Sequence, residues 1–345
     1  MAEWIETFHA RIFQYRSPGE LFGKLPRDDR LEALESRRAA LLAGLASAAG
    51  RDDLVVDATH KVEELTAVAR AALEAGTYDE DLPSFSGEHT SELRTSLRAY
   101  RVIEHLVEGA HANVYRGEYE RDGGVVEQVA IKIPRGPELD GASLNESRVL
   151  GLLAHKSLPI IVDTFRAPSG AIATITRLID GVDLRDVHER YPAGLPSVHV
   201  WWILDRLLSV LGFMHSRRVI HGAIEPGNVM IRPRDHNAFL LDFLFAVVDP
   251  ARSGQGFKSV VPGFSAPEVA ERRSPAPPAD LYALGKTMTW LAGGAVDEPL
   301  RGFLLRLVEP DPLHRPRDAW ELCRELRLLR DRTYGAERSF VELIL

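Results

Sequence analysis

The feature that most constrains this chain is the stretch His221–Asn228, which reads His-Gly-Ala-Ile-Glu-Pro-Gly-Asn. The apolar run Ala238–Leu241 comes next, and it ends at Asp242-Phe243-Leu244. The first motif mixes histidine, glutamate and asparagine with Gly and Pro, which mark turns and loops. These motifs indicate a polar loop followed by a short apolar segment, and the rest of the chain is interpreted around them.

The two motifs resemble the catalytic loop H-R-D-L-x-x-x-N and the D-F-G motif of the protein kinase family. On this resemblance, Asn228 and Asp242 match the two residues that hold the metal ion. Ala223 stands where the family places its general base. Glu225 replaces a Lys that many serine/threonine kinases use to steady the transferred phosphate, and Gly222 replaces an Arg. The resemblance therefore implies a kinase fold whose catalytic loop is degenerate at Ala223 and Glu225.

Composition limits the classes of partner that the chain can have. Its 345 residues are 45% hydrophobic and 27% charged, which is typical of a soluble globular protein with two or three domains. The formal net charge of −8 argues against nucleic acid as a partner, because phosphate backbones are bound by concentrated Lys and Arg. The N-terminus lacks a basic segment followed by an apolar one, and no apolar run approaches the ~20 residues that span a bilayer. We therefore expect a cytoplasmic protein with no membrane partner.

The single cysteine, Cys323, excludes an internal disulfide and is interpreted as a buried structural thiol.

The N-terminal region predicts an all-α helical domain over residues 1–76. Ser17–Glu20 has the signature of a helix start, and a short helix through Leu25 is expected. Apolar residues at helical spacing predict two longer helices over Leu31–Ala49 and Lys61–Leu73, antiparallel through a connection at Gly50–Asp57. This order resembles that of a J-domain, the chaperone module, although His-Pro-Asp is absent. A generic helical accessory domain is the alternative. The polar, acidic residues 77–96 are interpreted as a linker.

Residues 97–330 are interpreted as the kinase-like domain, and residues 331–345 as an apolar tail that docks on its own domain or on a partner. Alternating patterns and tight turns predict antiparallel strands over Tyr100–Leu106, Asn113–Glu120 and Val125–Pro134. The segment Val107–Val114 aligns with the family's glycine-rich loop, and only the middle glycine, Gly109, is present. Glycine matters there because backbone N–H groups must approach phosphate oxygens closely.

Lys132 ends the run Val129-Ala130-Ile131-Lys132 on the third of these strands. An ammonium among apolar strand residues needs an anionic partner, because its desolvation is costly. On resemblance, Lys132 holds nucleotide phosphates and pairs with Glu146 in the segment Leu144–Leu150. An edge-strand lysine at the surface is the alternative.

Two further strands are predicted over His155–Phe165 and Ala171–Ile179, and the second leads into a hinge. The resemblance aligns Thr176 with the gatekeeper, places Leu178 on the adenine-binding backbone, and puts Val114, Ala130 and Met230 around the purine. Ordinary core packing is the alternative for these three apolar residues. The complete set of expected nucleotide-binding residues is Gly109, Val114, Ala130, Lys132, Glu146, Thr176, Leu178, Asn228, Met230 and Asp242.

A long amphipathic helix is predicted over Val198–His215, ahead of the catalytic loop. The resemblance aligns Phe245–Ser265 with the activation segment. It also assigns structural roles to four polar residues, and the flanking apolar residues predict burial rather than surface positions. These residues are His221, Glu268, Asp280 and Arg315, with Arg315 expected to pair with Glu268.

Together these observations predict an α+β, bilobal protein kinase-like fold with a β-rich N-lobe, a helical C-lobe and an N-terminal helical domain. The function that the resemblance implies is that of a pseudokinase. Such a protein binds ATP or another nucleotide, with or without Mg²⁺ on Asn228 and Asp242, and acts as a scaffold or allosteric regulator of another protein. That partner is expected to be an active kinase, a chaperone or an effector.

Three alternatives stay open. The first is a slow or atypical serine/threonine kinase that uses Glu225 as its base. The second is a degenerate kinase fold that binds no nucleotide. The third is a chaperone-type adaptor that works through its helical domain.

Overall fold

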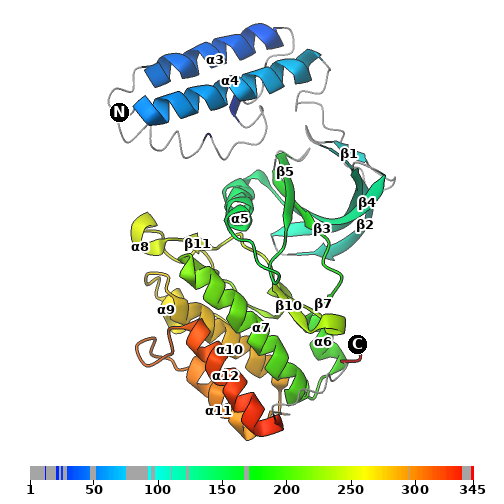
Figure 1. The fold of residues 1–345 in the computed structure, drawn as a ribbon, viewed down its shortest axis with the longest axis vertical. Helices are drawn as coiled ribbons and strands as arrows, with labels where there is room; N and C mark the ends of the chain where they lie inside the picture. Colours follow the sequence, from blue (N-terminus) through cyan, green and yellow to red (C-terminus); the bar gives the residue numbers. More distant parts are fainter. Residues whose placement is uncertain are drawn as a thin grey trace. The chain divides into compact units, whose positions relative to one another are not determined.

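The computed structural model describes residues 12, 21–22, 25, 29–46, 52–74, 92–94, 98–109, 111–121, 124–166, 171–294, 296–335 and 343–345. The chain divides into two compact units. The first contains residues 1–139 with 163–175, and the second contains residues 140–162 with 176–345. Figure 1 shows helices followed by a sheet in the first unit and a mainly helical second unit. The predicted α+β, bilobal fold class with N-terminal helices is confirmed.

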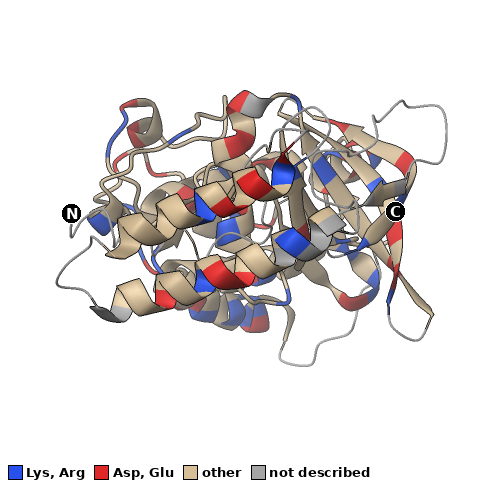
Figure 2. Ribbon diagram, turned by 90° about the horizontal axis from the view of Figure 1, so that it is seen from above, with Lys and Arg blue, Asp and Glu red and all other residues tan. Residues whose placement is uncertain are grey.

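Two helices, α3 (Arg30–Ala46) and α4 (Asp52–Glu74), pack side by side. Their shared core contains Leu34, Leu45, Val62 and Leu65. Figure 2 shows Lys and Arg positions interspersed with Asp and Glu positions along both helices, as expected for amphipathic helices. Of the short helix predicted through Leu25, the structure describes residues 21, 22 and 25, and residues 21–22 are helical.

The helix α4 begins at Asp52, so the predicted connection Gly50–Asp57 is wrong over most of its length. Leu54 and Val55 pack against the core of the helix pair, and Ala58 is fully buried within it. Burial of these apolar side chains stabilises an additional two turns of helix, which the polar residues around them conceal in the sequence.

A six-stranded sheet in the order β1-β2-β3-β4-β6-β5 follows. Its first four strands are antiparallel neighbours, and the three predicted strands match β2, β3 and β4. The segment β1 lies inside the predicted linker 77–96, most of which falls outside the described residues. The strands are β1 (Glu92–Arg94), β2 (Ala99–Glu108), β3 (Ala112–Arg121), β4 (Val125–Pro134), β5 (Ile161–Arg166) and β6 (Ile172–Arg177).

The strand β5 begins at Ile161, so the prediction of a strand from His155 is wrong at its start. His155 instead forms a turn, because its Nδ1 atom accepts a hydrogen bond from the Ser157 amide at 3.1 Å. The His155 carbonyl accepts another from the Leu158 amide at 3.1 Å. Within the first unit, the buried Tyr100 hydroxyl donates to the buried Asp163 carboxylate at 3.1 Å and ties β2 to β5.

The second unit is built around α7 (Ser197–Ser216), which matches the predicted long helix and contacts α10, α12 and β10. Small sheets β10-β9-β7 and β11-β8 lie beside the helices. The other helices are α5 (Asp140–Leu152), α6 (Leu184–Arg190), α8 (Pro250–Ser253), α9 (Pro267–Ala270), α10 (Pro277–Ala292), α11 (Glu298–Leu307) and α12 (Ala319–Tyr334). The short strands are β7 (Val182–Asp183), β8 (Val219–Ile220), β9 (Val229–Arg232), β10 (Asn237–Leu240) and β11 (Val247–Val248), and the 3₁₀ turns are η1 (Pro137–Leu139), η2 (Pro226–Asn228) and η3 (Pro233–Asp235).

The helix α7 is long and apolar enough to span a bilayer by length and composition, with 20 residues and a mean hydropathy of 1.2. The prediction that no apolar run approaches this length is therefore wrong. Of its most apolar 18-residue stretch, 72% is buried inside the protein. Core helices of globular proteins pass the same test, because burial on all sides selects the same side chains as lipid does.

The C-terminal tail returns to the second unit. The helix α12 continues to Tyr334, past the predicted domain end at residue 330. Leu343 is buried in the main hydrophobic cluster. The Tyr191 hydroxyl donates to the Ile344 carbonyl at 2.8 Å. Of the two outcomes expected for the tail, docking on its own domain is the one observed at these residues.

Candidate functional site

The loop that begins at His221 is held by one buried carboxylate on α10. Asp280 is 1% exposed and accepts hydrogen bonds from the backbone amides of His221 at 2.9 Å and Gly222 at 2.8 Å. His215 Nε2 lies 3.0 Å from the same carboxylate. Burial alone would raise the pKa of Asp280, but the hydrogen bond and charge of His215, with His221 and the Gly222 amide, hold that pKa below its ordinary value.

The position that the resemblance aligns with the general base, Ala223, is buried within this loop. Ala223 is 5% exposed, and its carbonyl accepts a hydrogen bond from Asn228 Nδ2 at 2.8 Å. The backbone N–H of Asn228 donates a hydrogen bond to the Glu225 carbonyl at 3.0 Å, and this bond closes the turn η2. The loop is thus internally braced, although the methyl group of Ala223 can neither accept nor donate a proton.

Glu225 is paired with Arg185 from α6. The distance between Arg185 Nη2 and Glu225 Oε2 is 2.9 Å, and the guanidinium lies against Gly227. A Cβ atom at position 227 would lie only 2.6 Å from Arg185 Cζ, so glycine leaves the space that the arginine fills. The facing guanidinium offsets part of the negative charge that Glu225 brings to this loop.

The segment Asp242-Phe243-Leu244 is fastened to α5 by two neighbouring side chains. Glu146 Oε1 accepts a hydrogen bond from the Phe243 amide at 3.0 Å. Asn145 Nδ2 lies 3.3 Å from the Phe243 carbonyl, 3.2 Å from the Leu244 carbonyl and 2.8 Å from the Ala246 carbonyl. Sequence reasoning missed Asn145, and its only sequence signal is its place next to Glu146.

The two expected metal-holding residues lie on connected backbone. The Leu241 amide donates to the Asn228 carbonyl at 2.8 Å, which fixes Asp242 one residue beyond this bond. Asp242 has a positive φ of 62°. Its Oδ1 accepts from the Leu244 amide at 3.4 Å. The side-chain nitrogen Nδ2 of Asn228 donates a hydrogen bond to the Ala223 carbonyl. The side-chain oxygen Oδ1 of Asn228 is therefore the atom left to bind a metal.

Oxygen ligands of this kind suit Mg²⁺, which is commonly held by one or two side chains together with substrate phosphates. In the described ranges no group of three or more His, Cys, Asp and Glu residues could hold a metal ion. The residues present thus fit a metal that arrives with a phosphate ligand, and they do not form a dedicated protein cage.

The expected nucleotide-binding residues of the first unit lie on β3, β4 and the turn before β3. The Gly109 amide donates to the Ala112 carbonyl at 2.9 Å, and a Cβ at Gly109 would lie 2.8 Å from that oxygen. This glycine therefore permits a tight turn, and its N–H is used within the turn. Lys132 is half-buried on β4, directly opposite Val114 on β3, and Ala130 is two residues away on the same strand.

The remaining expected residues belong to the second unit and are half-buried. Thr176 lies at the end of β6, Leu178 follows that strand, and Met230 lies on β9. Met230 is opposite Phe239 on β10 and Asp183 on β7. Four of the ten expected residues thus lie in the first unit and six in the second.

The expected pair Arg315–Glu268 is present and buried. Arg315 Nη1 lies 2.6 Å from Glu268 Oε1, and Nη2 lies 3.2 Å from Oε2. The same guanidinium donates to the carbonyls of Pro278 at 2.7 Å, Glu309 at 2.9 Å and Pro310 at 3.1 Å. These bonds connect α9 and α10 to the segment before α12.

A comparison with family models matches residues 100–299, more than half of the chain, to the protein kinase domain. The chain is 29% identical to cyclin-dependent kinase 14 of Oryctolagus cuniculus over 138 residues, which is 39% of this chain and 28% of that protein. It is 29% identical to serine/threonine-protein kinase F of Synechocystis over 175 residues, 43% of this chain and 34% of that protein. It is 28% identical to serine/threonine-protein kinase Pkn1 of Myxococcus xanthus over 222 residues, 61% of this chain and 31% of that protein.

The aligned parts cover about a third of the length of these curated relatives. Likeness therefore extends to the kinase region and leaves most of each relative unmatched.

Proposed function

This chain belongs to the protein kinase domain family, and we propose that within this family it is a pseudokinase that binds a nucleotide and acts through another protein. The observation that carries the proposal is Ala223, a buried methyl group at the place of the general base. A positioned general base contributes about 10²–10⁴-fold to a reaction rate. With a methyl group in its place, phosphate transfer is expected to be slow at best.

The environment of Glu225 supports this proposal over an active kinase that uses Glu225 as its base. Its carboxylate is directed to the Arg185 guanidinium, with the two groups 2.9 Å apart. A general base must instead reach the proton of the acceptor hydroxyl.

Nucleotide binding is proposed from the residues that remain. Lys132 would contact the phosphates, and Asn228 and Asp242 would hold Mg²⁺ through their oxygen atoms. When bound, the metal neutralises charge on the phosphates. The Gly109 N–H already donates a hydrogen bond within its own turn, so one donor that would face the phosphates is used up. We therefore expect nucleotide to bind more weakly than it does to a kinase with a full glycine loop.

The chain is proposed to act by binding a protein partner that recognises the conformation of the second unit. This partner would be an active kinase, a chaperone or an effector. Asn145 and Glu146 support this idea, since they fasten the segment after Asp242 to α5 through four polar contacts. The fastened residues Phe243, Leu244 and Ala246 are themselves buried, so the proposed role of these contacts is to keep the surrounding surface of the second unit in one arrangement for a partner.

The test of nucleotide binding is the melting temperature of the full chain with ATP, ADP and GTP, each with Mg²⁺, Mn²⁺ or EDTA. A ligand at 100 times its Kd adds about 2.7 kcal/mol to the free energy of unfolding. We expect a rise with at least one nucleotide, lost in Lys132→Ala and retained in Lys156→Ala, which removes an exposed lysine. No rise under any condition would reject the nucleotide-binding part of the proposal.

The test of catalysis is phosphate transfer from radiolabelled ATP to generic protein acceptors. We expect turnover far below the roughly 1–100 s⁻¹ of active kinases. Ala223→Asp leaves the Arg185–Glu225 pair intact and supplies a carboxylate, whereas Ala223→Asn matches its size without its basicity. Ordinary kinase turnover by the unmodified chain would overturn the pseudokinase assignment.

A further inference from the structure

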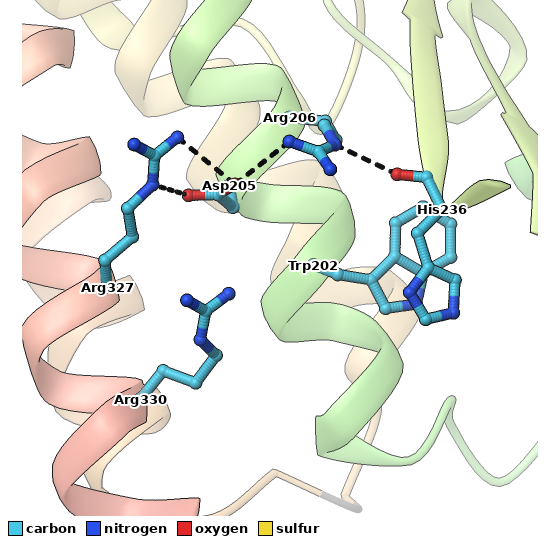
Figure 3. Close-up of a pocket in the computed structure, with 6 residues that line it drawn as sticks. All are labelled: Trp202, Asp205, Arg206, His236, Arg327 and Arg330. Atoms are coloured by element: carbon cyan, nitrogen blue, oxygen red, sulfur yellow. Dashed lines mark hydrogen bonds and ion pairs between the residues drawn. The ribbon is translucent and has the colours of Figure 1, made fainter. Parts of the chain in front are cut away.

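A second site lies in the second unit, between α7 and α12, and shares no residue with the expected nucleotide-binding set. It is a cavity of about 390 Å³. Figure 3 shows it lined by Arg327 and Arg330 from α12 on one side and by residues of α7, with His236, on the other. Its lining residues are Trp202, Asp205, Arg206, His236, Arg327 and Arg330.

The lining is strongly cationic for a chain whose formal net charge is −8. Three guanidinium groups face one carboxylate, Asp205. Arg327 Nε lies 2.5 Å from Asp205 Oδ1, and Arg206 Nη1 lies 3.6 Å from Oδ2. Asp205 balances one of these arginines and Asp331, next to the lining, pairs with Arg330 at 3.4 Å, so with Asp331 counted three guanidinium groups face two carboxylates and an excess of positive charge remains.

Hydrogen-bond donors also exceed the acceptors in this cavity. Arg206 Nε donates to the His236 carbonyl at 3.0 Å, and Arg330 Nη2 lies 3.4 Å from the neighbouring Asp331 carboxylate. Arg330 Nε is buried and has no hydrogen-bond partner among the described residues. A buried donor without an acceptor is costly. An anion that reached Arg330 Nε would supply the acceptor that this one atom lacks.

Two aromatic rings that do not belong to α12 also line the cavity. The rings of Trp202 and His236 are stacked, with centroids 4.6 Å apart and planes 7° from parallel. Figure 3 shows the ring pair and Arg330 on either side of the α7 ribbon, and all three residues line the cavity. The lining thus combines guanidinium groups with aromatic rings, which suits a ligand that joins an anionic group to a planar apolar body.

We infer that this cavity binds a phosphate monoester with an aromatic body. Guanidinium groups bind phosphate through paired N–H···O bonds, and clusters of arginine are a recurrent mode of phosphate recognition. The volume falls in the range of roughly 300–1,000 Å³ that is usual for small-ligand sites. The phosphate can come from a phosphorylated tyrosine of a protein partner or from a free aryl phosphate, since both present the same chemistry.

Helix packing provides a competing explanation, because Arg327 and Asp205 already tie α12 to α7. Arg330 separates the two explanations. Its guanidinium bonds to the adjacent residue Asp331 and not to α7, so anchoring of the helix does not require it.

Calorimetric titration of the full chain with phenyl phosphate, in about 150 mM salt to screen weak surface attraction, tests the inference. We expect binding with a Kd of about 1 mM or lower, and binding of phenol at least about tenfold weaker. Arg330→Ala should weaken phenyl phosphate about tenfold or more, and Arg330→Lys should weaken it by less. Arg324→Ala, which removes an exposed arginine of the same helix, should leave the Kd within about twofold.

Loss of the fold in Arg330→Ala would be recognised from its melting temperature, and Arg330→Gln then replaces it as the test variant. No binding of phenyl phosphate, or equal weakening by Arg330→Ala and Arg324→Ala, overturns the inference. Tighter binding of a tyrosine-phosphorylated peptide than of phenyl phosphate assigns the ligand to a protein partner. Equal affinities assign it to a free phosphate. The ATP-induced rise in melting temperature should persist in the Arg330 variants, so failure here is distinguishable from failure of the nucleotide proposal.

Discussion

The second unit contains buried charged residues that hold its backbone and a loop, His221–Asn228, that one of them supports. The two regions differ in burial and in the number of their polar contacts. Asp280, Glu268 and Arg315 are buried and make several short polar contacts each. On the loop, Ala223 carries no functional group, and Glu225 forms an ion pair that is partly exposed to water. The comparison indicates that the side chains that anchor this fold are different from those at the general-base position, so the anchors can be retained whatever residue stands at position 223.

Breaking the Glu268–Arg315 pair should have the largest effect on stability. Glu268→Ala leaves a buried guanidinium without its carboxylate, which typically costs about 3–5 kcal/mol. The matched control is Glu325→Ala, which breaks a pair with Arg306 whose side chains are 47–49% exposed. That loss should cost about 0–1 kcal/mol. Denaturant unfolding measures both, and equal costs would contradict the assigned role of the buried pair.

Replacing Asp280 should have the next largest effect. Asp280→Asn weakens the anchoring of the His221 and Gly222 amides, at a cost of about 1–3 kcal/mol. The native pKa of Asp280 is depressed, so its ionised form stabilises the fold above the unfolded-state pKa of about 4. That contribution is lost as pH falls through the native pKa.

Unfolding free energies measured from pH 7 to pH 3 should therefore decline less steeply in Asp280→Asn than in the unmodified chain. An identical acid dependence in the two proteins would rule out this contribution.

Removing the contacts of Asn145 should have a smaller and local effect. Asn145→Ala deletes the donor shared by three carbonyl groups after Asp242, and we expect a loss of about 1–2 kcal/mol. Amide hydrogen exchange should accelerate in residues 243–248. Leu144→Ala serves as control, because Leu144 is 45% exposed on the same helix. Unchanged exchange in Asn145→Ala would show that other contacts hold the segment.

The Arg185–Glu225 pair should contribute least. The side chains are 58% and 23% exposed, so a double-mutant cycle with Arg185→Ala and Glu225→Ala should give a coupling of about 1 kcal/mol or less. A coupling of several kcal/mol would mean that the loop depends on this pair as strongly as on its buried anchors, and the contrast between the two regions would disappear.

The fold was predictable wherever the signal is local. The alternation in β4 gave its bounds, Val125–Pro134, without error. The three-residue strand β1 was missed, because Glu92–Arg94 is too short for an alternating pattern and is defined by its pairing with β2.

The residues of the candidate site could be predicted only where they occupy a position in a recognised sequence motif. The partner of Glu225 is Arg185, 40 positions earlier, and the partners of Asn145 are backbone carbonyls about 100 positions later. The cavity between α7 and α12 is lined by residues of the two helices that are more than 100 positions apart in the sequence. No pattern within one segment carries such pairings, because tertiary packing creates them.

The buried Cys323 makes the junction of α7 and α12 chemically observable. Burial and the nearby Asp205 raise the pKa of this thiol to about 11, and Sγ lies 3.5 Å from Asp205 Oδ1. Thiol reagents attack the exposed thiolate, so modification of the folded chain requires α12 to lift from α7. Because Cys323 is the only cysteine of the chain, the rate of its alkylation measures how often α12 separates from α7. A ligand bound beside Asp205 would slow this alkylation.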